Sequence, residues 1–331
     1  MNLTSQPIPM TPRHTSNPLR VCLLGATGTI GRATVQALVA RGHQVVCFVR
    51  RGAGPRGTWA PQETAVKLAG ADTRLVEVSS AESLARDGFR GEPFDALVSC
   101  MASRTGAPQD AWAIDYQAHV LALEAARRAR VAHFVLLSAI CVQKPLLAFQ
   151  HAKLAFEKAL VESGLAYTIV RPTAFFKSLS GQIERVRRGK PFLVFGDGSL
   201  TACKPVSDRD LAQYLTDCLE DRSRRDRVLP IGGPGEAITP RQQGEQLFAL
   251  LDGVVRVLGG LGQMVPAAAE KAELARIGRY YATESMLVLD PQSGRYDAAR
   301  TPSTGTQTLF DYYARLLDGS AAAERGDHAV F

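Results

Sequence analysis

Short apolar runs alternate with segments of helical spacing along the first half of the chain. The runs are rich in β-branched and aliphatic residues and predict strands at residues 21–24, 44–49, 74–78, 96–100, 134–138 and 167–171. Apolar positions recur at helical spacing between several of these runs and predict helices at residues 32–40 and 116–130. Strands that alternate with helices are typical of a parallel sheet covered on both faces. The pattern therefore predicts an α/β fold with a Rossmann-type, doubly wound parallel sheet.

A glycine-rich turn joins the first expected strand to the first expected helix. Its glycines are spaced G-x-x-G-x-x-G, so backbone amides at the helix start can approach a pyrophosphate without an intervening Cβ. A glycine triplet alone also fits an ordinary βα turn, but its place after the first strand favours a dinucleotide site. The residues of this turn that we expect to bind a cofactor are Gly25, Thr27, Gly28, Thr29, Ile30 and Gly31.

Two arginines, Arg50 and Arg51, end the second expected strand. An acidic residue at this place binds the ribose hydroxyls of NAD, whereas an arginine fits the 2′-phosphate of NADP. The alternative is a solvated pair on a loop. We therefore expect NADPH as the cofactor, with Val78, at the end of the third expected strand, lining the adenine site.

The alternation of strands and helices weakens after about residue 175. Glycine and proline punctuate the later segments, notably "FGDGSL" and "PIGGPGEAITP". We expect residues 19–175 to form the NADP-binding Rossmann domain. Residues 176–331 are expected to form mainly a smaller C-terminal substrate lobe, with segments that return to the Rossmann domain. Residues 1–18, rich in Thr, Ser, Pro and Asn, read as a mobile N-terminal extension without the apolar core of a secretory signal.

The glycine triplet, the two arginines and the motifs "LLSA" and "IVRPTAFF" resemble the short-chain dehydrogenase/reductase superfamily, in its atypical, NmrA-like branch. The resemblance covers about residues 20–235. It implies cofactor contacts from Ser138, Lys153, Pro172 and Thr173. In that superfamily a Tyr-x-x-x-Lys pair does acid–base work: the tyrosine protonates a carbonyl oxygen, and the lysine lowers its pKa and holds the nicotinamide ribose.

The acid–base pair is only half retained in this chain. Lys153 takes the place of the lysine, but Phe149 stands where the tyrosine is expected. Positions 149 and 153 share a helix face, and a phenyl ring has no proton to donate. His151 points elsewhere and is a poor substitute. We therefore expect Lys153 to be catalytic in a reaction that needs no acid at a carbonyl oxygen, such as reduction of an activated carbon–carbon double bond.

A more specific resemblance covers about residues 141–212. The stretches "CVQKPLLAFQHAKLAFE", "YTIVRPTAFFKSL" and "FGDGSLTACKPVSDRDLA" are similar to the vinyl reductases of chlorophyll and bacteriochlorophyll biosynthesis. The resemblance implies NADPH-dependent reduction of the 8-vinyl group of a divinyl magnesium tetrapyrrole to ethyl. The conjugated macrocycle spreads the negative charge left by hydride addition, and water or Lys153 would supply the second proton.

A magnesium tetrapyrrole is large, flat and apolar and carries an anionic propionate. Its pocket should offer aromatic or aliphatic walls and a cationic rim. The expected substrate-binding residues are Phe149, Phe175, Phe176 and Lys177. Core packing is the alternative for Phe175 and Phe176, and solvation is the alternative for the lysine. The magnesium would belong to the substrate, because no carboxylate cluster in the sequence suggests a metal held by the protein.

Composition narrows the partners. The 331 residues are 46% hydrophobic and 21% charged, which is typical of a globular protein, and six cysteines without a CxxC pair favour a reducing, cytoplasmic setting. The net charge of +7 comes partly from arginine runs without interleaved aromatics, so we expect no nucleic-acid partner. Charges interrupt the apolar stretch 247–269, which argues against a membrane span there. Peripheral contact with photosynthetic membranes and the oligomeric state stay open.

Two other function classes fit parts of the pattern. Branch members without the tyrosine include redox sensors and assembly factors that bind a dinucleotide without turning it over. An ene-reductase of the isoflavone-reductase type, acting on a phenolic substrate, is the second alternative. The retained Lys153 and the match over residues 141–212 favour the vinyl reductase.

Overall fold

The computed structural model describes residues 17–52, 54, 57–251, 256–258 and 269–321. The predicted N-terminal extension lies outside the described residues, apart from its last two positions. Part of the apolar stretch 247–269 lies outside them as well.

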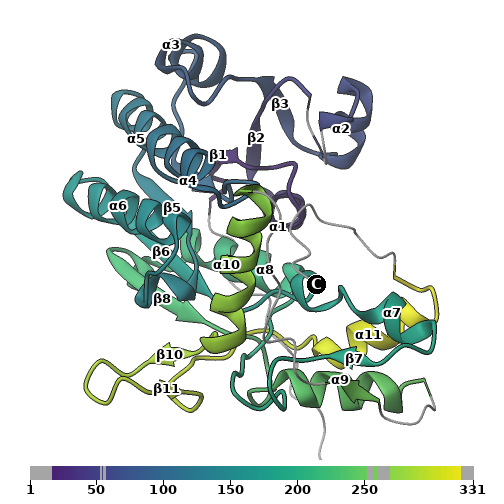
Figure 1. Cartoon of the computed structure of the whole chain (residues 1–331). Coiled ribbons are helices and arrows are strands. Elements are labelled where there is room, and N and C mark those ends of the chain that lie inside the picture. The colour runs from purple at the N-terminus through teal and green to yellow at the C-terminus, as the bar shows by residue number, and fades with distance from the viewer. Residues whose placement is uncertain (1–16, 53, 55–56, 252–255, 259–268, 322–331) are drawn as a thin grey trace, which may run out of the picture.

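A seven-stranded sheet forms the centre of the fold (Figure 1). All neighbouring strands in it are parallel, in the order β3-β2-β1-β4-β5-β6-β8. The strands are β1 (Arg20–Leu24), β2 (Gln44–Val49), β3 (Asp72–Leu75), β4 (Ala96–Ser99), β5 (His133–Leu137), β6 (Ala166–Pro172) and β8 (Arg227–Ile231). The order reverses direction between β1 and β4, which is the point where open α/β sheets bind their ligands. The prediction of a Rossmann-type, doubly wound parallel sheet is confirmed.

Helices cover both faces of this sheet because successive side chains of each strand point to opposite sides. In β1, Val21 and Leu23 pack into one apolar layer, and Cys22 and Leu24 pack into the other. Helices α1 (Thr29–Ala40) and α8 (Asp208–Glu220) contribute to the first layer. Helices α5 (His119–Arg128) and α6 (Ala148–Glu162) contribute to the second.

The helix predicted at residues 116–130 differs from the observed element. A wider π-helical turn occupies Trp112–Ala118 and passes directly into α5. Apolar spacing does not encode such a turn, because the turn depends on contacts with other parts of the chain. Here Asp115 is held inside the turn by the Ser103 amide and the Lys153 ammonium. The wide turn therefore belongs to the site described below.

The later chain builds smaller units beside the sheet. Helices α7 (Ile183–Arg187), α9 (Pro240–Ala249) and α11 (Leu309–Leu317) gather on one side of the molecule (Figure 1) and share an apolar cluster with β7 (Phe192–Leu193). Strand β7 pairs with β9 (Val257–Leu258). The other α-helices and strands are α2 (Pro61–Lys67), α3 (Ala81–Ser83), α4 (Pro108–Ala111), α10 (Ala269–Thr283), β10 (Val288–Leu289) and β11 (Tyr296–Asp297).

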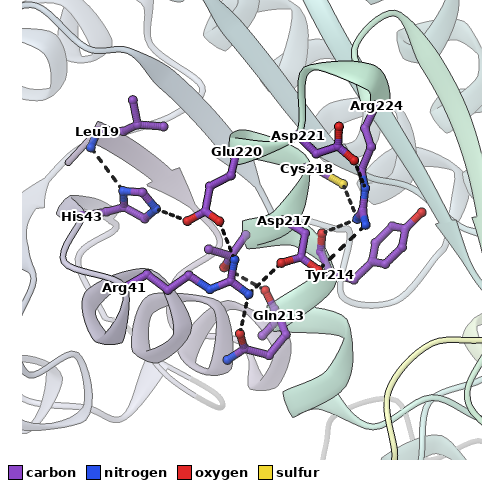
Figure 2. Close-up of polar contacts among 12 residues, drawn as sticks. Leu19, Arg41, His43, Gln213, Tyr214, Asp217, Cys218, Glu220, Asp221 and Arg224 are labelled. Carbon is purple, nitrogen blue, oxygen red and sulfur yellow. Dashed lines mark hydrogen bonds and ion pairs between the residues drawn. The ribbon is translucent and has the colours of Figure 1, made fainter. Parts of the chain in front are cut away.

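A polar cluster fastens α8 to the end of α1 (Figure 2). The Arg41 guanidinium lies 2.7 Å from both the Asp217 and the Glu220 carboxylates. The buried His43 ring accepts a hydrogen bond from the Leu19 amide at Nδ1, so its Nε2 carries the proton and donates to Glu220 over 3.2 Å. The cluster thus joins the helix that connects β1 to β2 with the helix that precedes β8, on one face of the sheet.

Replacing Arg41 with methionine should lower the free energy of unfolding by about 2 kcal/mol, because two carboxylates lose a charged hydrogen-bond donor in a partly buried place. Arg86 is the matched control, since it binds Glu82 and Asp87 on an exposed surface. Arg86→Met should leave the free energy of unfolding nearly unchanged. Urea unfolding of both variants measures the two losses, and equal losses would contradict a structural role for the cluster.

The described helices include none that is long and apolar enough to cross a membrane.

Candidate active site

A cavity of about 550 Å³ opens where β4, β5 and β6 end. Its walls come from the segments that follow these strands, from α6, from the chain just before α7, from β7 and the chain after it, from the start of α9, and from α10. Predicted site residues on these walls are Ile30, Ser138, Phe149, Lys153, Pro172, Thr173 and Phe175. The predicted catalytic lysine, part of the predicted cofactor set and two predicted substrate residues therefore meet in one cavity, of a volume typical of small-molecule sites.

The glycine-rich turn leaves space for a phosphate group at one position in particular. A Cβ on Gly25 would lie 2.6 Å from the backbone of Cys100 and Met101, and a Cβ on Gly31 would lie 2.1 Å from the Gly25 carbonyl. The packing of the protein itself therefore requires both glycines. A Cβ on Gly28 would meet nothing closer than 3.4 Å, and Gly28 is exposed at the start of α1. The turn fits a pyrophosphate at that helix start.

The chain after β2 carries Arg50 and Arg51, both exposed. The pKa of the Arg50 guanidinium lies below its usual value, first because neighbouring protein displaces water and second because the charge of Arg104 lies nearby. Arg104, in the loop after β4, donates to the Gly54 carbonyl over 2.8 Å and so ties this loop to the loop after β2. Two guanidinium groups therefore lie close together where a Rossmann fold holds the adenosine ribose. Sequence reasoning missed Arg104, which no spacing links to Arg50.

Lys153 forms a buried ion pair. Its ammonium lies 2.9 Å from Oδ1 of Asp115, whose side chain is 0% exposed, while the Lys153 side chain is 11% exposed. Burial alone would raise the pKa of Asp115, but the Lys153 charge and the Ser103 amide outweigh it and hold the pKa below its usual value. The other carboxylate oxygen of Asp115 is buried without a hydrogen-bond partner among the described residues. Asp115 thus fixes the Lys153 ammonium in the cavity wall.

A neutral histidine lies behind this ion pair. Nδ1 of His119 lies 2.8 Å from the Ile114 carbonyl, and Nε2 lies 2.8 Å from the Ser99 hydroxyl. Burial first and the Lys153 charge second lower the pKa of His119 to about 4. The ring therefore donates at Nδ1 and accepts at Nε2, and it packs against Phe156. Asp115 and His119 stand four residues apart on one helical segment, a spacing that could have pointed to them.

The Ser138 hydroxyl does not donate its proton into the cavity. It donates to the buried Glu157 carboxylate, which also pairs with Arg171. The Thr173 hydroxyl likewise donates to the Lys204 carbonyl. Both residues line the cavity, but neither hydroxyl proton faces a ligand there. With Phe149 one turn before Lys153, the wall offers no phenol at the expected place.

Two of the expected substrate-binding residues, Phe176 and Lys177, do not line the cavity. Phe176 is 3% exposed and packs in the apolar cluster of α7, α9 and α11, with its ring against Tyr312. Lys177 reaches the glycine-rich turn instead, where its ammonium lies 2.6 Å from the Thr29 hydroxyl. Val78, in the chain after β3, is partly buried and packs against the apolar layer that includes α5 and α6.

The described part of the chain contains no cluster of three His, Cys, Asp or Glu side chains that could hold a metal ion. The Glu284 carboxylate on the cavity wall is engaged by two other side chains. The Lys144 ammonium pairs with Glu284 at 2.8 Å, and Tyr296 donates to the same carboxylate.

Comparison with solved structures agrees with the architecture. An NADPH-dependent quinone oxidoreductase of Escherichia coli, solved with NADPH, superposes with a TM-score of 0.66 at 18% sequence identity, covering 90% of this chain and 99% of that one. A UDP-glucuronic acid 4-epimerase of Bacillus cereus superposes with a TM-score of 0.67 at 17% identity, covering 91% and 98%. At these identities the likeness shows the fold.

Sequence comparison is more specific. A family profile described as NAD(P)H-binding matches residues 25–222. The chain is 46% identical to the divinyl chlorophyllide a 8-vinyl-reductase of Zea mays, over 94% of this chain and 82% of that protein. It is 47% identical to the one of Cucumis sativus, over 94% and 79%. The photosystem II assembly factor Ycf39 of Synechocystis is 25% identical over 65% and 63%. The chain is thus an NAD(P)H-binding protein that belongs to the divinyl chlorophyllide a 8-vinyl-reductase family.

Proposed function

We propose that this protein reduces the 8-vinyl group of a divinyl magnesium tetrapyrrole to ethyl with NADPH. The observation that carries the proposal is the cavity wall beside Lys153. Phe149 takes the position one turn before the lysine, and the Ser138 hydroxyl donates its proton to the Glu157 carboxylate. A wall that offers no proton at these places suits a conjugated alkene better than a carbonyl group.

The residues around the cavity would have different roles in binding the cofactor and the substrate. NADPH, when bound, supplies the hydride. The glycine-rich turn with Gly28 would hold the pyrophosphate, and Lys177, at Thr29, would add a positive charge beside it. Lys153, fixed by Asp115, would hold the nicotinamide ribose. Phe149 and Phe175 would offer apolar surface to the macrocycle.

Incubation of the pure protein with NADPH and divinyl chlorophyllide a tests the proposal. The expected result is consumption of NADPH, a blue shift of the Soret band and a product heavier by two hydrogens. Carbonyl substrates should stay unchanged. If the tetrapyrrole is recovered unchanged under anaerobic conditions while NADPH is bound, the reductase proposal is wrong, and a dinucleotide-binding sensor or assembly factor is favoured.

The choice of NADPH over NADH is a prediction about Arg50. A guanidinium paired with the 2′-phosphate contributes about 1.5–3 kcal/mol, or roughly tenfold to a hundredfold in affinity. Arg50→Ala should therefore weaken NADPH binding by that factor and leave NADH binding unchanged. Fluorescence titration of both cofactors measures this, and the control is Arg90→Ala, at an exposed arginine whose guanidinium donates to the Asp87 carbonyl. Equal affinity of the unaltered protein for NADPH and NADH would contradict the prediction.

A further inference from the structure

The proposed reduction needs one proton in addition to the hydride, and several cavity-lining donors are already engaged. The Lys153 ammonium is held by Asp115, and the Ser138 hydroxyl is held by Glu157. The Glu284 carboxylate is ion-paired with Lys144. A donor in the cavity therefore has to come from a group whose proton is not already used in a strong hydrogen bond.

Tyr281 meets this condition. It lines the cavity from α10, and its hydroxyl lies 4.0 Å from the Cys141 sulfur, which is a weak acceptor. Burial first and the neighbouring Cys141 second raise the pKa of the Tyr281 phenol well above its usual value. The phenol therefore stays protonated until a strongly basic atom comes close.

Tyr281 and Lys153 converge on the same part of the cavity. Cys141 lies beside Tyr281, and burial raises the pKa of the Cys141 thiol. The Lys153 charge is close enough to Cys141 to oppose this rise in pKa in part. Ile277, one turn before Tyr281 on α10, approaches Phe149 across Gly106: a Cβ there would lie 3.2 Å from Ile277 and 3.4 Å from Phe149. The face of α10 that carries Tyr281 thus packs toward the face of α6 that carries Lys153.

Helix α10 is fixed firmly enough to position a donor. The Tyr280 hydroxyl donates to the Cys141 carbonyl over 2.9 Å and to the Lys144 carbonyl over 3.1 Å. The chain just after α10 is held by Gln143. The Gln143 side chain accepts from the Leu289 amide over 2.8 Å and donates to the Leu287 carbonyl. Residues far apart in the sequence are therefore held together beside the cavity, as the central position of α10 in Figure 1 illustrates.

We propose that Tyr281 is a catalytic residue that donates the one proton that the vinyl reduction needs in addition to the hydride. The inference rests on the proposed function. A C–H bond forms between the transferred hydride and the terminal vinyl carbon as NADPH is oxidised, and the π electron pair moves to the inner carbon and the macrocycle. The inner carbon then takes the proton of the Tyr281 O–H, and the phenolate left behind is reprotonated by water.

The test is reduction in deuterated water with unlabelled NADPH. In the unaltered protein, deuterium should enter one of the two diastereotopic positions of the ethyl methylene group, because a fixed phenol delivers from one face. Tyr281→Phe should lower turnover at least about a hundredfold. Its remaining product should carry deuterium at both positions, because water then reaches either face. Nuclear magnetic resonance of the product measures the distribution.

Binding measurements and a neighbouring tyrosine provide the controls. Tyr281→Phe should bind NADPH and, without NADPH, divinyl chlorophyllide a as tightly as the unaltered protein, followed by the visible absorption of the tetrapyrrole. Tyr280→Phe removes a hydroxyl that binds backbone carbonyls, so it should lower stability and keep deuterium at one position.

Three outcomes would overturn the inference. The first is full turnover in Tyr281→Phe. The second is reduced turnover with deuterium still at one position, since a structural role would slow the reaction without changing the face of protonation. The third is deuterium at both positions in the unaltered protein. Failure of the unaltered protein to reduce the tetrapyrrole would instead overturn the proposed function on which the inference rests.

Discussion

Replacing Lys153 with methionine is expected to lower the turnover number at least about a hundredfold, because the nicotinamide ribose loses the group that would hold it in place for hydride transfer. The same change leaves the Asp115 carboxylate buried without its cation. An unpaired buried charge costs about 3–5 kcal/mol of stability. Steady-state kinetics and thermal unfolding of the variant measure the two effects separately.

A double variant separates catalysis from folding. Lys153→Met combined with Asp115→Asn removes both charges and keeps an oxygen that accepts from the Ser103 amide. This protein should regain most of the lost stability and stay as inactive as the single variant. Recovery of turnover together with stability would show that Lys153 acts only through folding, and near-normal turnover in the single variant would remove its catalytic role altogether.

The second large effect is expected at the glycine-rich turn. Replacing Gly31 or Gly28 with alanine should lower stability in one variant and NADPH affinity in the other. Gly31→Ala places a Cβ 2.1 Å from the Gly25 carbonyl, so backbone has to move. We expect a loss of about 3 kcal/mol in the free energy of unfolding. Gly28→Ala meets nothing closer than 3.4 Å and should fold normally, but its methyl group would occupy the approach of the pyrophosphate. NADPH affinity should fall at least about tenfold, which corresponds to about 1.4 kcal/mol.

Thermal unfolding without cofactor and NADPH titration distinguish the two variants. Gly31→Ala should show the lower melting temperature, and Gly28→Ala should melt like the unaltered protein while binding NADPH weakly. Unchanged NADPH affinity in Gly28→Ala would contradict the placement of the pyrophosphate at this turn. A normal melting temperature in Gly31→Ala would contradict the packing requirement.

Much of the fold follows from local sequence. Six apolar runs predicted strands that the structure contains, with ends that differ by at most three residues. Strand β2 has the predicted bounds, Gln44–Val49. These strands are visible in the sequence because both faces of a parallel sheet are buried, so whole runs are apolar. The eighth strand, β8, was not predicted, since Arg227–Ile231 lies at the sheet edge, is largely exposed or half-buried and includes a proline.

The sequence by itself also determined the family, the glycine-rich turn and the pairing of Lys153 with a phenylalanine one turn earlier, because these depend on residue types at short spacings. Only the tertiary structure decided the partners of those residues. Asp115 meets Lys153 across 38 positions, Arg104 meets Gly54 across 50, and Tyr281 meets Cys141 across 140. Each contact joins segments whose separation along the chain carries no periodic signal. The packing of α10 and the loops against the sheet brings them together, and local propensity does not contain that information.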